Sequence, residues 1–125
     1  MDGEAGAQLK NAAVLDRTLA ALADPHRRAV VDLLSNRPRP AGELARSLNL
    51  TAPAMSRHLR VLRESGLVVE SHPTFDARVR VYALRPEPMI DLMRWLEETE
   101  IMWSEQLAAF KAHIEQSPGH GSDTS

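Results

Sequence analysis

The residues best suited to chemistry are arginines and hydroxyls spaced along one face of a predicted helix at positions 52–65. At the α-helical period, one side of this helix is apolar and carries Met55, Leu59 and Leu62. The opposite side carries Pro53, Arg57, Arg60 and Glu64, and Ser56 and Arg63 flank it. Guanidinium groups make paired hydrogen bonds to phosphates and guanine edges, and a helix with one apolar face can enter the major groove while attached to its domain. The pattern predicts a DNA-reading helix; an ordinary exposed helix face is the alternative.

The segments around this helix are typical of a helix-turn-helix. Thr51 is a favourable N-cap, and Pro53 occupies the tolerated first turn. A short amphipathic helix is predicted at 41–48, with a turn at 49–51. Gly66 stands where a left-handed residue commonly ends a helix.

A β-hairpin is predicted after the helix, with strands at 67–71 and 78–84 and a loop at 72–77. Arg78 and Arg80 fall on one side of the second strand, together with Tyr82. A wing of this kind would place the two arginines along phosphates or in the minor groove. An exposed strand face without ligand is the alternative reading.

His58 lies at the edge of the apolar face, so a partly buried structural histidine and a DNA contact are both open. The full set of predicted DNA-binding residues consists of Thr51, Ala54, Ser56, Arg57, His58, Arg60, Arg63, Arg78 and Arg80.

The charge distribution supports an anion-seeking middle segment. The whole chain has a net charge of −2, but positions 25–85 hold eleven arginines against five acids, a net of +6. The acidic residues concentrate at the two ends of the chain. A basic block between acidic ends is typical of a domain with one nucleic-acid-binding face.

The remaining elements are helices at 11–23, 25–36 and about 87–116, with a linker at 37–40. The expected fold is mainly α with a small β-hairpin: a winged helix-turn-helix of about five helices and a two-stranded wing. One domain is expected over 11–116, with a flexible N-terminus at 1–10 and a disordered tail at 117–125.

The long last helix carries more apolar residues than one small core needs, which predicts pairing with a second subunit beside the helix at 11–23. Packing on its own domain alone is the alternative. The predicted dimer interface consists of Leu15, Leu19, Leu92, Trp95, Leu96, Trp103, Leu107 and Phe110.

Several classes of protein are disfavoured. The chain has no cysteine, no membrane-length apolar run and no secretory leader pattern, so we expect a cytoplasmic protein. No nucleophile–base set, phosphate loop or histidine ligand spacing is present, so we expect no enzyme activity, cofactor or metal.

Three stretches together resemble the ArsR/SmtB family of bacterial winged-helix repressors: ELARSLNLTAPAMSRHLRVLRESGLVV at 43–69, LAALADPHRRAVVDLL at 19–34, and RVRVYAL at 78–84. The resemblance covers roughly residues 12–115. It implies a homodimer that controls transcription and leaves DNA when it receives a signal, with DNA contacts at Ser56, Arg57 and His58. Metal-sensing members carry a cysteine pair before the recognition helix or Asp/His pairs in the last helix. This chain has neither, so it resembles the non-metal members. The sequence does not identify its inducer.

The expected function is therefore a double-stranded DNA-binding transcriptional regulator, a repressor acting as a homodimer on an inverted-repeat operator. A winged-helix protein-interaction or dimerisation module without DNA binding is the alternative.

Overall fold

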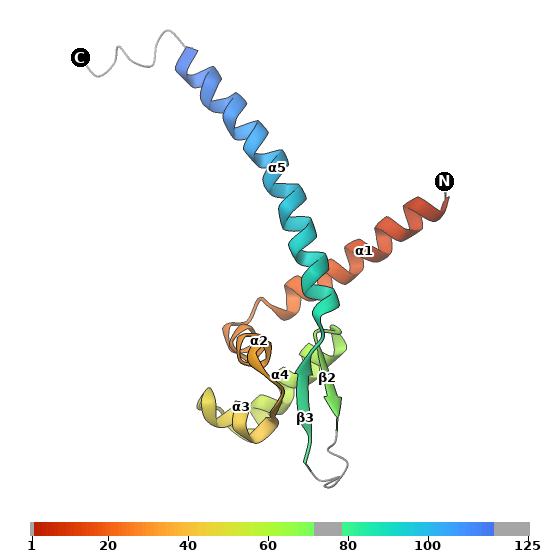
Figure 1. Cartoon of the computed structure of the whole chain (residues 1–125), viewed down its shortest axis with the longest axis vertical. Coiled ribbons are helices and arrows are strands. Elements are labelled where there is room, and N and C mark those ends of the chain that lie inside the picture. The colour runs from red at the N-terminus through yellow and green to blue at the C-terminus, as the bar shows by residue number, and fades with distance from the viewer. Residues whose placement is uncertain (1, 72–78, 117–125) are drawn as a thin grey trace, which may run out of the picture. The chain divides into compact units, whose positions relative to one another are not determined.

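The structure is a computed structural model that describes residues 2–71 and 79–116, with side chains from residue 12 onward. Its elements run in the order α1 (Asp2–Ala21), α2 (Pro25–Asn36), β1 (Arg39–Pro40), α3 (Ala41–Ser47), α4 (Ala52–Glu64), β2 (Val68–Ser71), β3 (Val81–Leu84) and α5 (Pro86–Gln116) (Figure 1). Five helices and a small antiparallel sheet confirm the predicted winged helix-turn-helix. By internal contacts the chain forms two units, residues 1–92 and residues 93–125, which are described separately.

Helix α1 starts at Asp2, earlier than the predicted residue 11. Carbonyl groups at its end and just beyond it accept hydrogen bonds from the next helix: Arg27 donates from Nε to the Ala21 oxygen at 2.6 Å, and Arg28 donates from Nη1 to the Leu22 oxygen at 2.7 Å. Cations are favoured there because the C-terminal end of a helix carries partial negative charge. The expected flexibility of residues 1–10 stays a prediction.

Helix α2 begins at Pro25, and Asp24 is its N-cap. Oδ1 of Asp24 accepts hydrogen bonds from the backbone N–H groups of His26 at 2.8 Å and Arg27 at 3.1 Å. Removal from solvent raises the pKa of Asp24, but these hydrogen bonds and the charges of His58 and Arg27 together bring that pKa below its ordinary value. The carboxylate is therefore ionised at neutral pH.

The sheet contains a strand that the sequence analysis did not predict. Residues 37–40 were expected to form only a linker, but Arg39 pairs with Tyr82 and Pro40 with Val81. The strand order is β1-β3-β2, so the wing hairpin is extended to three strands. A two-residue strand is too short to leave a periodic signal in the sequence.

The hairpin itself is confirmed, with register from Val68↔Leu84 to Ser71↔Val81. Its strands are shorter than predicted, because β2 begins at Val68 and β3 at Val81. The expected loop at 72–77 and Arg78 lie outside the described residues.

The core of the first unit forms where the helices and the sheet meet. Its largest fully buried side chains are Thr18, Val30, Leu44, Met55, Leu59, Leu62 and Leu67. Thr18, the polar member, donates its hydroxyl to the Val14 carbonyl at 3.0 Å, so it is satisfied within its own helix. This core holds α4 by its apolar face alone.

Helix α5 begins in the first unit and continues through the second as one helix of 31 residues. The observed span agrees closely with the predicted 87–116, and the expected disordered tail at 117–125 lies outside the described residues. No helix in the described part of the chain combines the length and apolar character needed to cross a membrane.

Candidate nucleic-acid interface

Helix α4 presents the two contrasting faces that the sequence predicts. Met55, Leu59 and Leu62 are each 1% exposed or less. The predicted polar side is exposed at Ser56, Arg57, Arg60 and Arg63. Ala54, also a predicted DNA contact, is half-buried at the start of the helix. The arrangement leaves a polar surface free along a helix whose other face is fixed in the core.

The turn before α4 fixes how α3 and α4 meet. Asn49 adopts a left-handed backbone with φ of 56°, a conformation that asparagine tolerates better than most residues. The Leu50 N–H then donates to the Ala45 carbonyl at 2.9 Å, which satisfies a group at the end of α3. Thr51, the predicted N-cap, accepts at Oγ1 from the Ala54 N–H at 3.3 Å. Its hydroxyl oxygen is thus already used in starting α4.

Glu70 on β2 contacts two of the predicted DNA-binding residues, Arg63 and Arg80. Its carboxylate lies 2.6 Å from Nη1 of Arg63 and 3.5 Å from Nε of Arg80, and Tyr82 donates its hydroxyl to it at 3.3 Å. Arg80 and Tyr82 reach the same acid, which agrees with their predicted placement on one side of the strand. Tyr82 is buried, however, while the side chain of Arg80 is 62% exposed. In the free protein Arg63 and Arg80 are therefore tied to the wing.

A second acid, Glu43 on α3, pairs with Arg37 and Arg39. Hydrogen bonding to Arg37 is the main cause that lowers the pKa of Glu43, and the charges of Arg37 and Arg39 add to it. Arg39 also donates from Nε to the Leu33 carbonyl at 3.0 Å. These two arginines thus tie the segment between α2 and α3 in place.

Among the exposed arginines of α3 and α4, three have no ion pair or hydrogen bond within the described residues: Arg46, Arg57 and Arg60. Arg46 lies on α3, and the other two lie on α4. Unpaired guanidinium groups on a helix-turn-helix surface are available to phosphates and base edges. Arg46 was not in the predicted set, although its place on the short helix before the turn could have suggested it.

The position of His58 favours a partly buried structural role over a DNA contact. Its side chain is 18% exposed, and its Nδ1 lies 3.9 Å from Oδ1 of Asp24 on the α2 N-terminus. Its ring centroid lies 5.6 Å from that of His26. Sequence spacing gave no sign of this grouping, because the partners lie on different helices.

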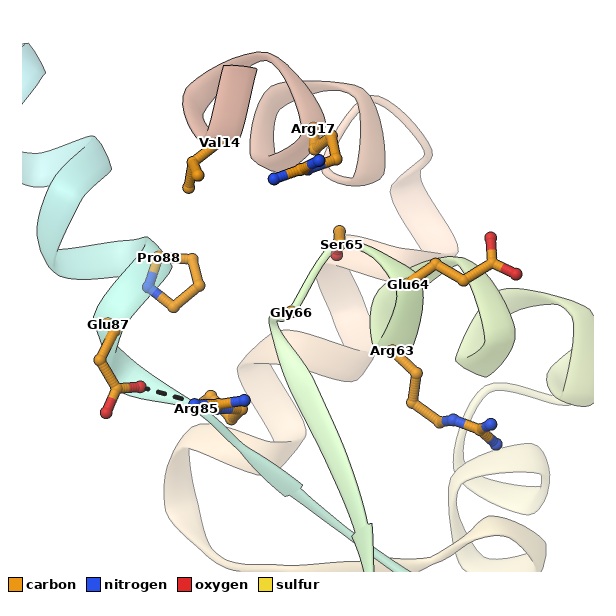
Figure 2. A pocket seen from close by; sticks show the side chains of 9 residues that line it. All are labelled: Val14, Arg17, Arg63, Glu64, Ser65, Gly66, Arg85, Glu87 and Pro88. Atoms are coloured by element: carbon orange, nitrogen blue, oxygen red, sulfur yellow. Dashed lines mark ion pairs between the residues drawn. The ribbon is translucent and has the colours of Figure 1, made fainter. Parts of the chain in front are cut away.

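An open hollow of about 280 Å³ lies beside the end of α4. Figure 2 shows Val14 and Arg17 of α1 above it and Pro88 of α5 at its side, while Arg63 and Glu64 point away. Arg85 at its lower edge pairs with Glu87 at 3.8 Å. The hollow is thus lined by apolar groups and by charged groups of which only some are paired, and its lining does not include Arg46, Arg57 or Arg60.

The residues predicted for a dimer interface differ in how much surface they offer. Most are 41–62% exposed: Leu19, Trp95, Leu96, Trp103, Leu107 and Phe110. Leu15 is half-buried. Leu92 departs from the expectation because it is only 7% exposed in the single chain, which leaves it little surface for a partner.

Comparison with known proteins identifies the fold's relatives. A helix-turn-helix domain family model matches residues 22–71. The chain is 38% identical over 109 residues to the HTH-type transcriptional regulator Rv2034 of Mycobacterium tuberculosis (strain H37Rv), covering 87% of this chain and 94% of that protein. It is 34% identical to the ArsR family transcriptional regulator RHA00566, whose crystal structure matches with a TM-score of 0.65 over 73% of this chain and 91% of that one.

The chain belongs to the ArsR family of transcriptional regulators. It is also 26% identical, over 66% of its length and 88% of the relative, to the transcriptional repressor SdpR of Bacillus subtilis (strain 168). These relatives are named as transcriptional regulators, so this chain is a DNA-binding transcriptional regulator.

Proposed function

We propose that this ArsR-family protein is a homodimeric repressor that binds an inverted-repeat operator with α4 in the major groove. The observation that carries the proposal is the set of unpaired arginines Arg46, Arg57 and Arg60 on α3 and α4. Ser56, exposed beside Arg57, adds a hydroxyl that can bond a base or a phosphate. The relative named a repressor supports the direction of regulation.

The proposed contacts fall into two groups. Ser56, Arg57 and Arg60 would read or approach base edges, since they project from the exposed face of the helix. The other predicted residues would position the duplex: Thr51, Ala54, His58, Arg63, Arg78 and Arg80. Arg63 and Arg80 must exchange some of their contact with Glu70 for phosphate, which lowers the net gain from each.

Dimerisation is proposed from the apolar surface of α5. Side chains that are half exposed or more along one helix, such as Trp103, Leu107 and Phe110, are costly in water. A two-fold dimer would cover them and would present two α4 helices symmetrically, about one turn of DNA apart.

The test is selection of genomic fragments by the purified protein, followed by anisotropy titration of the selected duplex at several salt concentrations. We expect an inverted repeat. If the dimer neutralises about 6–10 phosphates, affinity should fall about 10³–10⁵-fold between about 50 and 200 mM salt. Failure to bind any duplex above background would contradict the proposal and favour a protein-interaction module.

A further inference from the structure

Three side chains with metal-ligating groups meet where the start of α2 faces α4: Asp24, His26 and His58. Each offers one ligand atom, and these atoms lie within 4.8 Å of one another. Nδ1 of His26 and Nδ1 of His58 each lie 3.9 Å from Oδ1 of Asp24. We propose that this cluster is a binding site for a divalent transition-metal ion such as Zn²⁺, held by two imidazoles and one carboxylate.

The ligand atoms have capacity to spare. Within the described residues, the side-chain hydrogen bonds and ion pairs of Asp24 all use Oδ1, so Oδ2 is left for a metal. Both imidazoles turn Nδ1 toward the carboxylate, and neutral imidazole nitrogen is a common ligand for such ions. The carboxylate therefore keeps its role as helix cap while it can accept an ion.

The three ligand atoms lie farther apart than a bound ion requires, so the site must contract on binding. Zn²⁺ binds nitrogen and oxygen ligands at about 2.0–2.2 Å, so tetrahedral ligand atoms lie roughly 3.3–3.6 Å apart. The two 3.9 Å separations to Oδ1 exceed the required ones by about 0.3–0.6 Å, and all three ligand atoms lie within 4.8 Å of one another. His26 can close that gap by side-chain rotation, because its side chain is 48% exposed.

The donor set selects the class of ion. Two imidazoles and one carboxylate suit zinc, iron, cobalt or nickel in the divalent state, whereas calcium and magnesium prefer oxygen ligands alone. Three protein ligands leave one tetrahedral position for water. The positive end of the α2 dipole opposes a cation here, but the charge of Asp24 lies directly at that end and offsets it.

The site would join two elements that sequence spacing does not connect. Asp24 and His26 belong to the start of α2, and His58 belongs to α4, next to Arg57. In metal-sensing members of the family, the metal ligands lie in the helix before α4 or in the last helix. The present cluster lies at neither of these places. Metal binding here can be measured without DNA. The experiment therefore tests this inference independently of the proposed function.

The experiment uses the full chain freed of metal by a chelator. Calorimetry with Zn²⁺ should give one ion per chain, and Co²⁺ should develop the visible absorption of a tetrahedral complex. His26→Gln and Asp24→Ser should each lower the affinity by at least about 10–100-fold, since even loss of an outer partner has that effect. Serine keeps the helix cap while it removes the carboxylate.

The matched control is His113→Gln, the same change at an exposed histidine of α5, which should leave the affinity unchanged. Circular dichroism must show that each variant stays folded. Equal metal uptake by the parent and His26→Gln would overturn the proposal. So would a parent that takes up no metal, or a loss of affinity in His113→Gln as large as that in His26→Gln.

Discussion

Single arginine side chains on this surface differ in what they can offer to DNA, because nearby acids already hold some of them. Arg57 is exposed and has no partner among the described residues, whereas Arg63 on the same helix lies 2.6 Å from Glu70. Exposed ion pairs are individually weak, so pairing reduces the contribution of an arginine without abolishing it. Net charge alone would count the two as equal.

Replacing Arg57 by alanine should therefore reduce sequence preference. If its guanidinium forks onto a guanine, the loss should be about 1–3 kcal/mol for the operator and much smaller for a scrambled duplex. Paired anisotropy titrations measure both affinities. Arg63→Ala is the matched control on the same helix, and its effect should be smaller and similar on the two duplexes. Unchanged operator preference in a folded Arg57→Ala protein would rule out this role.

The ion pairs of Glu43 predict that the folded protein loses stability at acidic pH. Its pKa is lowered in the folded chain by Arg37 and Arg39, below an ordinary value of 4.5. A lowered folded pKa means that the stabilisation is complete above the ordinary value and is lost as the pH falls through the folded one. Glu43→Gln should therefore have a lower Tm than the parent at pH 7, and the difference should shrink as the pH falls below 4.5. A difference of the same size at pH 3 and pH 7 would exclude this pairing.

At the scale of the element, α4 depends on its two ends. Thr51→Ala removes the side-chain acceptor for the Ala54 N–H and should destabilise the protein by about 0.5–2 kcal/mol in urea unfolding. Thr51→Ser keeps an equivalent hydroxyl and should stay close to the parent. Equal stability of the alanine and serine variants would show that the cap contributes little.

The other end of α4 turns at Gly66, whose φ is 81°. A Cβ there would meet nothing within 4 Å, so the effect of Gly66→Ala should come from backbone strain alone, about 1–2 kcal/mol of destabilisation. Gly42→Ala is the contrasting control, because this glycine is helical and its Cβ would meet only the flexible end of Arg46 at 3.4 Å. That change should stabilise by about 0.5–1 kcal/mol. Chemical denaturation of both variants should give opposite signs.

The elements that periodicity identified were those with enough residues to show a period. The apolar face of α4, its Thr51 cap and the hairpin could all be predicted, because each depends on neighbouring residues. Strand β1 could not, since its two residues are fixed by pairing with β3. Nor could the engagement of Arg63 by Glu70 or of His58 with Asp24, because those contacts arise only when separate elements pack.

At the scale of the whole molecule, the exposed apolar side chains of α5 predict a dimer. Leu107, 57% exposed, lies among them, and Leu107→Glu should shift the protein toward monomer by placing a charge in the proposed interface. Sedimentation velocity measures the mass. Operator affinity should fall with it, because a monomer can occupy only one half-site at a time.

The neighbouring change Gln106→Glu adds the same charge at a polar position of α5 and should leave the mass unaltered. If Leu107→Glu kept the parent's mass, or if both variants dissociated equally, the apolar stripe would not be the interface.

The small strand β1 also affects the tendency of the protein to aggregate at high concentration. It forms one edge of the sheet, and an edge with free backbone groups can recruit strands from other chains and start aggregates. This edge is only two residues long, and Pro40 has no N–H to donate. Helix α3 follows at once and stops the strand from lengthening. The strand that completes the wing therefore also disfavours backbone pairing between copies along this edge of the sheet.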